Sequence, residues 1–319
     1  MKVVVLGTGG TIAGMADRAS QHGYRAGQVP VGQLTQGLAL PAGCELLAEQ
    51  VAQIDSKDMA EAVWLALARR LQHWLAQPEV HGVVVTHGTD TLEETAFFLH
   101  AVLQAGKPVV LTGAMKPASD AEPDGPGNLR DAIAVACMPG AQGVLVVFAG
   151  RVLAGSEVRK VHPKRIDAFE AGDAGCLARG RAGDWEILRG WPMAGADHVP
   201  GALEALQARL EQGGRLPWVA WLSSHAGATG REVRALLAAG VEGLVVAGTG
   251  NATLHREMEH ALDEARAAGV QVSIGSRCPL GDADPFDRGD RKPALTPAQA
   301  RIALQLSLLS STAPAARAA

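Results

Sequence analysis

Two threonine-containing loops carry side chains that can do nucleophilic chemistry. The first, GTGGTIAG, follows the apolar run VVVL and places Thr11 just beyond it. The second, THGTDTLEE, follows the run GVVV and contains Thr89 and Asp90. A threonine hydroxyl becomes a nucleophile when an adjacent base takes its proton. Glycines around Thr11 let backbone N–H groups approach a substrate carbonyl and stabilise the oxyanion that forms there.

The first loop also resembles a phosphate-binding loop in composition, and its spacing argues against that alternative. A dinucleotide-binding fingerprint needs glycines spaced GxGxxG and an acidic residue about 20 positions later. Gly7 and Gly9 fit, but Ile12 stands at the third glycine, and no Asp or Glu occurs in 18–44. A Walker loop would end in GK[ST], which is absent here. A structural alternative stays open, in which the Thr11 hydroxyl only closes a turn.

The second loop has a structural alternative too. Thr91 and Glu94 have the spacing of a helix capping box, and Asp90 can stabilise a helix N-terminus. This alternative leaves Thr89 without a role. Lys160 lies in the basic stretch RKVHPKR, where a solvated surface charge is the default. A lysine whose pKa is lowered by burial can nevertheless take a hydroxyl proton while an aspartate orients it, so Thr89, Lys160 and Asp90 form a coherent candidate group.

Both loops follow strands in a predicted alternation of strands and helices. Strands are expected over 3–6, 82–86, 108–112, 143–148, 218–222, 243–247 and 271–274. Helices are expected over 60–76, 92–104, 128–136, 201–212, 230–239, 254–268 and 297–309. Strands that are apolar at every position are covered on both faces, which predicts a three-layer α/β fold with a mainly parallel sheet and flanking helices. Ligands bind such sheets at the carboxyl ends of the strands, where both threonine loops lie.

The length of 319 residues favours two domains. The periodic pattern breaks up between 171 and 200, which predicts an N-terminal catalytic domain over 1–190, a linker over 191–205 and a smaller α/β domain over 206–319. The net charge of −4 argues against nucleic acid or an anionic membrane as a partner.

The cysteines and the apolar runs bear on the compartment. The four cysteines, far apart and without a CxxC pair, are Cys44, Cys137, Cys176 and Cys278. They predict neither a zinc site nor a disulfide framework, and each is expected to be a buried small apolar residue. No stretch reaches the roughly 18 apolar residues of a membrane span, and no signal-peptide pattern opens the chain, so a cytoplasmic protein is expected.

Taken together, the two loop sequences resemble the signatures of the bacterial-type L-asparaginase family of two-threonine amidohydrolases. The signatures are TGGTIAG (8–14) and GVVVTHGTDTLEETAFF (82–98). Further matching stretches are DSKDM (55–59), KPVVLTGAMKP (107–117), DGPGNLRDA (124–132), AGTGNATL (247–254) and LTPAQARIALQLSL near the carboxyl terminus. The resemblance therefore covers nearly the whole chain.

This resemblance implies roles for particular residues. Thr11 would be the nucleophile, and Tyr24, the only tyrosine in the chain, would contact its hydroxyl during catalysis. Thr89, Lys160 and Asp90 would form the second catalytic group. The implied reaction is hydrolysis of the side-chain amide of L-asparagine to L-aspartate and ammonia through an acyl-threonine ester, with no metal or cofactor.

Substrate binding and assembly are implied as well. Ser56 and Asp90 would hold the α-carboxylate and α-ammonium of a small amino acid substrate, next to Thr89. His87 would support the loop. The family implies a homotetramer, a dimer of dimers whose sites are completed by a neighbouring subunit.

Three positions depart from the family pattern. Lys57 stands where many members carry Gln or Glu near the substrate ammonium, so its cation either repels that group or turns outward. Thr253 replaces a second asparagine that some relatives contribute from the adjoining subunit. The stretch 281–294 is shorter than in some periplasmic members. Three acids there are candidates for an acidic residue expected in that region: Asp282, Asp284 and Asp287.

The sequence leaves other functions open. A glutaminase-asparaginase of broader specificity is one, because a single methylene changes binding by only about 1–3 kcal/mol. An amidase subunit acting on another carrier is a second. A non-catalytic amino-acid-binding module is a third, although binding alone does not need two threonines and a lysine.

Overall fold

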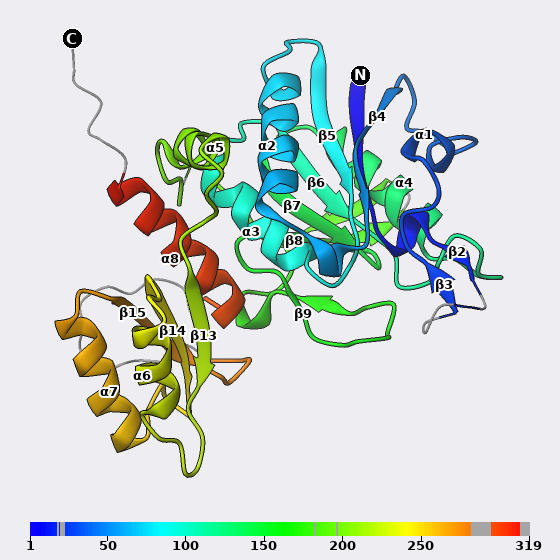
Figure 1. Cartoon of the computed structure of the whole chain (residues 1–319). Coiled ribbons are helices and arrows are strands. Elements are labelled where there is room, and N and C mark those ends of the chain that lie inside the picture. The colour runs from blue at the N-terminus through cyan, green and yellow to red at the C-terminus, as the bar shows by residue number, and fades with distance from the viewer. Residues whose placement is uncertain (18, 20–22, 182, 196, 282–294, 313–319) are drawn as a thin grey trace, which may run out of the picture. The chain divides into compact units, whose positions relative to one another are not determined.

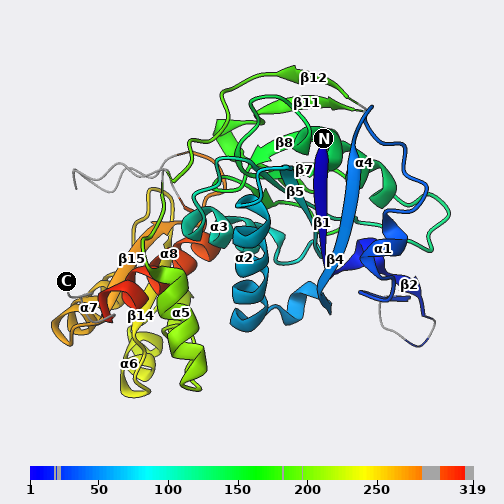
Figure 2. The ribbon, with the colours of Figure 1, turned by 90° about the horizontal axis from the view of Figure 1, so that it is seen from above.

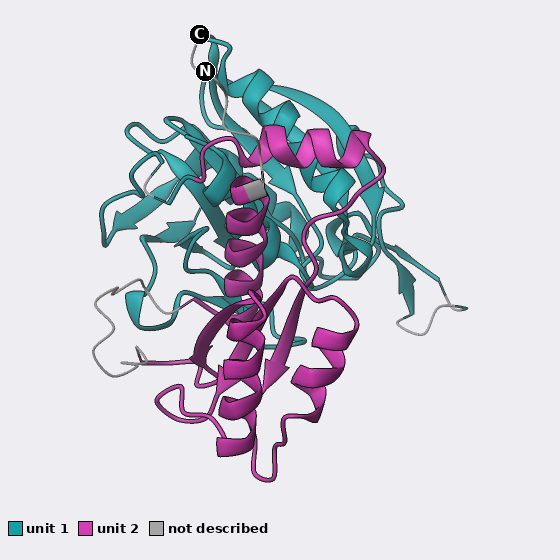
Figure 3. Cartoon of the chain, turned by 60° about the vertical axis from the view of Figure 1, so that its left-hand side comes forward, with its two compact units in different colours: residues 1–198 teal, residues 199–319 magenta. Residues whose placement is uncertain are grey.

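The computed structural model describes residues 1–17, 19, 23–181, 183–195, 197–281 and 295–312. The chain divides into two compact units, Met1–His198 and Val199–Ala319 (Figure 3). Each unit has its own sheet and its own buried apolar cluster. The narrower limits expected from the sequence, a linker over 191–205 between two domains, stay a prediction.

An eight-stranded sheet forms the centre of the first unit (Figure 1). Its strands are β1 (Lys2–Gly9), β4 (Glu45–Ile54), β5 (Val80–Thr86), β6 (Pro108–Thr112), β7 (Gly143–Phe148), β8 (Arg151–Ala154), β11 (Ala178–Arg181) and β12 (Asp184–Ile187). They are ordered β12-β11-β8-β7-β6-β5-β1-β4. The run from β7 to β4 is parallel throughout, and β8, β11 and β12 continue it antiparallel. The predicted mainly parallel α/β fold is confirmed.

Helices cover both faces of this sheet. They are α1 (Val31–Leu34), α2 (Glu61–Leu75), α3 (Leu92–Val102) and α4 (Gly125–Ala136). Val3 and Val5 of β1 share one apolar cluster with Ile133 of α4. The alternate residues Val4 and Leu6 face the other side and are equally buried. Figure 2 shows α2 and α3 on one side of the sheet and α4 on the other. Residues 3–6 of β1 are all apolar because both faces of the strand are covered.

Several short elements connect the main ones. They are β2 (Met15–Ala16) paired with β3 (Tyr24–Arg25), β9 (Arg159–Lys160) paired with β10 (Phe169–Glu170), and the 3₁₀ turns η1 (Thr11–Ala13), η2 (Ser56–Asp58) and η3 (Gly172–Ala174). Three of the five candidate catalytic residues of the sequence analysis belong to these short elements: Thr11 to η1, Tyr24 to β3 and Lys160 to β9.

The second unit is a smaller α/β domain. Its elements are α5 (Ala202–Glu211), β13 (Val219–Ser223), α6 (Arg231–Ala238), β14 (Gly243–Gly248), α7 (Arg256–Ala267), β15 (Gln271–Ser276) and α8 (Pro297–Thr312). The three strands are parallel in the order β13-β14-β15. Val233 of α6 and Met258 of α7 pack in one cluster with Leu244 and Val246 of β14. The second, smaller domain predicted from the sequence is therefore confirmed as a separate α/β unit.

The sequence prediction missed strands at the edges of the large sheet. β4 has the sequence ELLAEQVAQI, in which acids and amides interrupt the apolar residues, and most of its side chains are exposed or half-exposed. It lies at one edge, and among the described strands only β1 is its neighbour. It therefore does not need the uniformly apolar pattern that the prediction used. β11 and β12 form the opposite edge within 171–200, the stretch that the sequence analysis treated as irregular.

The start of α4 also differs from the prediction. The helix begins at Gly125 instead of residue 128 and takes in Pro126 within its first turn. Proline is tolerated there because the first N–H groups of a helix have no partner within the helix.

The cysteines are less buried than expected. Cys44, Cys137 and Cys176 are half-buried and Cys278 is exposed, and all four are free. Cys278 lies just beyond the end of β15, which explains its exposure. The thiol of Cys137 is directed at Cys44, with 3.5 Å between the sulfur atoms. In the part of the chain that the structure describes, no helix is both long and apolar enough to cross a membrane.

Candidate active site

The candidate residues gather at one edge of the large sheet. β4, β1, β5 and β6 are parallel neighbours, so their carboxyl ends meet at the same edge. The loops that follow them contain Ser56, Thr11, Thr89 and Gly113 respectively. The expectation that the two threonine loops lie side by side therefore follows from the strand order β1-β5.

Glycines bring these loops into direct contact. A Cβ built on Gly10 would lie 2.3 Å from the Cα of Gly88, and one built on Gly88 would lie 2.5 Å from the Oγ of Ser56. Gly10 also has a φ of +82°, which L side chains rarely adopt. The backbones of the two threonine loops can approach this closely only without side chains at both positions.

Thr11 is held at the first turn after β1. It is buried, and its hydroxyl is 2.9 Å from the phenolic oxygen of Tyr24. Tyr24 comes from the short strand β3, which pairs with β2. A hydrogen bond therefore joins the Thr11 hydroxyl to the Tyr24 side chain, the contact that the family resemblance implies.

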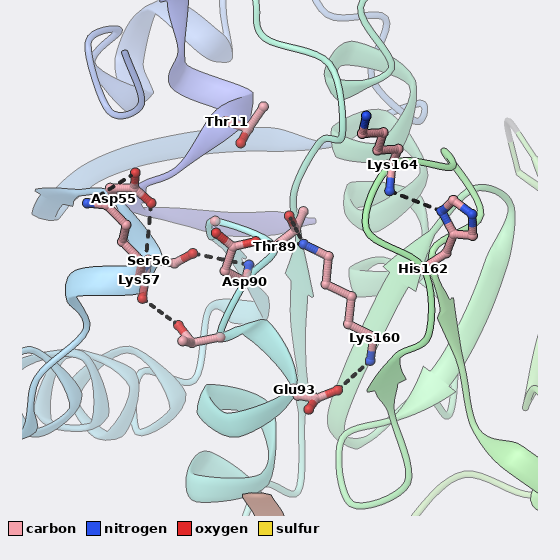
Figure 4. Close-up of polar contacts among 12 residues, drawn as sticks. Thr11, Asp55, Ser56, Lys57, Thr89, Asp90, Glu93, Lys160, His162 and Lys164 are labelled. Carbon is pink, nitrogen blue, oxygen red and sulfur yellow. Dashed lines mark hydrogen bonds and ion pairs between the residues drawn. The ribbon is translucent and has the colours of Figure 1, made fainter. Parts of the chain in front are cut away.

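Lys160 joins the two polar side chains of the second loop (Figure 4). Its Nζ donates to the Oγ1 of Thr89 at 3.0 Å and to Asp90 Oδ1 at 2.6 Å. The Lys160 side chain is only 16% exposed, so it is not a solvated surface charge. Asp90 is more open, with 57% of its side chain exposed. A cation between a hydroxyl and a carboxylate can move a proton and balance charge.

Ser56 forms hydrogen bonds that hold the second loop. Its buried hydroxyl accepts a hydrogen bond from the backbone N–H of Asp90 at 3.2 Å. The hydroxyl of Thr91 donates to the carbonyl of Ser56 at 2.8 Å instead of capping α3. The structural alternative that gave the Thr91 side chain to the helix is therefore wrong, because this hydroxyl joins two loops at the sheet edge.

Lys57 turns toward its own neighbours. Its ammonium is 2.6 Å from the carboxylate of Asp58 and 3.5 Å from that of Asp55. The side chain is 58% exposed. The Lys57 side chain therefore turns toward Asp55 and Asp58, whose carboxylates offset its positive charge.

His87 is part of the frame behind the second loop. It is fully buried, and burial lowers its pKa to about 4, so the ring is neutral at pH 7. Its Nδ1–H donates to the carbonyl of Gly88 at 2.7 Å. Its Nε2 accepts from the hydroxyl of Thr95 at 2.9 Å, and that hydroxyl in turn accepts from the indole N–H of Trp64. These bonds fix the tautomer and hold the peptide that precedes Thr89.

Two residues in this frame were not singled out by the sequence analysis. The carboxylate of Asp124 accepts from the backbone N–H groups of Met115 and Lys116 at 3.0 and 2.9 Å. The buried side chain of Asn128 donates to the carbonyl of Gly113 at 3.0 Å and accepts from the N–H of Ala149. Both lie in DGPGNLRDA (124–132), one of the stretches that resemble the asparaginase family. Polar side chains at the start of a helix were the sequence signal that could have identified them.

Other candidates belong to the second unit or lie outside the residues that the structure describes. Thr253 belongs to the second unit, where its hydroxyl bonds to that of Thr249 at 2.9 Å. Asp282, Asp284 and Asp287 lie outside the described residues. Among the residues that the structure describes, no group of three or more His, Cys, Asp or Glu has the arrangement of a metal site.

Known proteins share both the sequence and the fold. The chain matches the family Asparaginase, N-terminal, over residues 2–192 and the Glutaminase/Asparaginase C-terminal domain over residues 218–318. It is 34% identical to L-asparaginase 2 of Escherichia coli (strain K12), over 98% of this chain and 90% of that protein. It is 33% identical to the glutaminase-asparaginase of Pseudomonas fluorescens biotype A, over 96% of this chain and 86% of the relative.

A solved structure gives the same result. The probable cytoplasmic L-asparaginase from Campylobacter jejuni superposes with a TM-score of 0.84 at 33% identity, covering 96% of this chain and 94% of that one. Both signature loops, both units and the full-length similarity agree, and we conclude that the chain belongs to the asparaginase family.

Proposed function

We propose that this protein is an L-asparagine amidohydrolase that works through an acyl-enzyme on Thr11. The observation that carries the proposal is the Lys160 ammonium, which contacts both the Thr89 hydroxyl and the Asp90 carboxylate. The contact between Gly10 and Gly88 supports a single site that includes Thr11 and this group.

The reaction has two halves. In the first, the Thr11 oxygen attacks the side-chain amide carbon, backbone N–H groups of the loop stabilise the oxyanion, and the nitrogen leaves as ammonia after gaining a proton. In the second, water attacks the ester carbon, aspartate leaves, and the Thr11 hydroxyl recovers its proton. Tyr24 can orient the Thr11 hydroxyl, and Thr89 with Lys160 and Asp90 supplies a path for the transferred protons.

Substrate recognition follows from the groups around this path. The Asp90 carboxylate is exposed and negatively charged, which suits a substrate ammonium. The Ser56 hydroxyl accepts a hydrogen bond from the backbone N–H of Asp90 and so lies next to it. One relative is named a glutaminase-asparaginase. Ammonia release from equal concentrations of asparagine and glutamine measures the preference, and equal kcat/KM for the two would refute asparagine specificity.

Rapid mixing with asparagine, followed by acid quench and peptide mass spectrometry, tests the nucleophile. We expect an aspartyl adduct on the peptide that contains Thr11, and no adduct and no turnover with Thr11→Ala. Binding of asparagine without ammonia release by the unaltered protein would instead identify a binding module. Turnover without an adduct on this peptide, retained in Thr11→Ala, would remove Thr11 from the mechanism.

We also propose that the protein is a cytoplasmic homotetramer. The family resemblance implies the tetramer, and the similarity to a probable cytoplasmic L-asparaginase supports the location. Light scattering after size exclusion tests the assembly, and a stable monomer with full activity would refute it. Fractionation of the source cells tests the location.

A further inference from the structure

Lys160 lies on a short and isolated element. β9 consists of Arg159 and Lys160, and among the strands that the structure describes it pairs only with the equally short β10. In that ribbon the neighbouring Val161 N–H bonds across to Ala168 at 2.8 Å. A two-residue ribbon is too short to fix a long, flexible side chain by itself.

Glu93 supplies the missing anchor. Its carboxylate accepts a short hydrogen bond from the backbone N–H of Lys160 (Figure 4). Glu93 lies in the first turn of α3, only three residues after Asp90. Both ends of Lys160 are therefore held by one segment of chain, the backbone by Glu93 and the ammonium by Thr89 and Asp90.

The environment of Glu93 fits this role. The residue is half-buried, and burial raises its pKa, while the Lys160 N–H and the charges of Lys160 and Arg159 oppose the rise. Glu94, on the same turn, adds to it. A desolvated carboxylate is unfavourable unless hydrogen bonds compensate it, and the bond to the Lys160 N–H is such a bond.

We propose that Glu93 is a positioning residue, which holds the backbone of Lys160 so that its Nζ reaches Thr89 and Asp90. The inference rests on the proposed function, because it assumes that Lys160 takes part in the reaction. Glu93 acts only through Lys160.

Three substitutions of Glu93 separate the effect of side-chain length from the effect of the negative charge. Glu93→Gln keeps an oxygen acceptor at the same distance, Glu93→Asp keeps the charge but shortens the reach, and Glu93→Ala removes both. A displacement of about 1 Å in a catalytic group lowers a rate by roughly a hundredfold. We therefore expect kcat to fall roughly 30- to 100-fold in Glu93→Ala and Glu93→Asp, with KM within about threefold of the unaltered protein. Glu93→Gln should keep kcat within about tenfold.

Glu170→Gln is the matched control. Glu170 is an acid of the same ribbon and pairs with Arg159 at 3.4 Å, but it does not hold the Lys160 N–H. We expect kcat to be unchanged in this variant. Thermal unfolding of each variant corrects the rates for the folded fraction, so that a purely structural role would leave kcat per folded molecule unchanged.

The outcomes separate this inference from the proposed function. If Lys160→Met abolishes turnover while Glu93→Ala and Glu93→Asp keep kcat within threefold, the positioning role is refuted and the proposed function stands. The positioning role is also refuted if the kcat of Glu93→Gln is as low as that of Glu93→Ala. If Lys160→Met keeps normal turnover, the proposed proton path itself fails.

Discussion

Gly10 and Gly88 meet backbone to backbone, with the position of a Gly10 Cβ only 2.3 Å from the Gly88 Cα. This contact joins the loop of Thr11 to the loop of Thr89. It also explains the glycine immediately before the threonine, in a loop whose spacing differs from that of a phosphate-binding fingerprint.

Gly10→Ala tests this contact. The positive φ costs about 1–3 kcal/mol for a residue with a Cβ, and overpacking against Gly88 adds a similar amount, about 1–3 kcal/mol. We expect a lower free energy of unfolding and a kcat reduced about a hundredfold, because the loops must separate. Urea unfolding measures the free energy of unfolding, and ammonia release measures kcat.

Gly37→Ala is the control for strain alone. Gly37 has a φ of +69°, but no atom of the residues that the structure describes lies within 4 Å of a Cβ built there. It should lose stability without losing kcat per folded molecule. Equal kcat losses in the two alanine variants would contradict the assigned role of the contact.

Thr89 and Lys160 are expected to act as a unit. Thr89→Val and Lys160→Met should each lower kcat by about a thousandfold or more, and the double variant should be no more than about tenfold worse than the poorer single one. Lys164→Met is the control and should keep normal kcat, because Lys164 is an exposed lysine of the segment that joins β9 to β10. Independent, fully multiplying losses would show that Thr89 and Lys160 serve separate steps.

The strand order explains how much of the site the sequence predicts. Uniformly apolar runs identify β1 and β5 as central strands, and their carboxyl ends place Thr11 and Thr89 at one edge. Local patterns can supply this information because each loop directly follows its strand.

Contacts between distant segments are different. The bond from Lys160 to Glu93 spans 67 positions, and the hydroxyl of Thr91 reaches Ser56 over 35. Neither partner can be identified from local spacing, which for Thr91 favoured a helix cap. β4 escaped prediction for a related reason, since an edge strand such as this one tolerates polar residues at positions that a central strand would bury.

The cysteines provide a test of burial in the first unit. Burial and the hydrogen bond to Cys44 raise the pKa of Cys137 to about 12, so very little thiolate forms at pH 8. We expect iodoacetamide to label the exposed Cys278 first and Cys137 last, as peptide mass spectrometry can follow. Labelling in urea is the control and should make all four react alike. Equal labelling of Cys137 and Cys278 in the folded protein would contradict the structure.

His87 should make stability depend on pH. Its pKa is about 4 in the fold and about 6.5 in an exposed histidine. Between these two pH values the unfolded chain therefore binds more protons than the folded one. The free energy of unfolding rises with pH across that window, and the contribution of His87 is lost as the pH falls from 6.5 toward 4. The difference corresponds to about 3 kcal/mol.

His87→Gln should remove this contribution, although it also lowers stability at pH 7 by disturbing the bonds to Gly88 and Thr95. Urea unfolding between pH 4 and pH 7.5 should then show a gap between the two proteins that narrows by about 3 kcal/mol as pH falls. His81→Gln, at an exposed position near the start of β5, should follow the unaltered protein in parallel. A gap that stays constant with pH in His87→Gln would mean that the ring is already protonated or solvated in the fold, and the neutral tautomer that holds Gly88 would have to be abandoned.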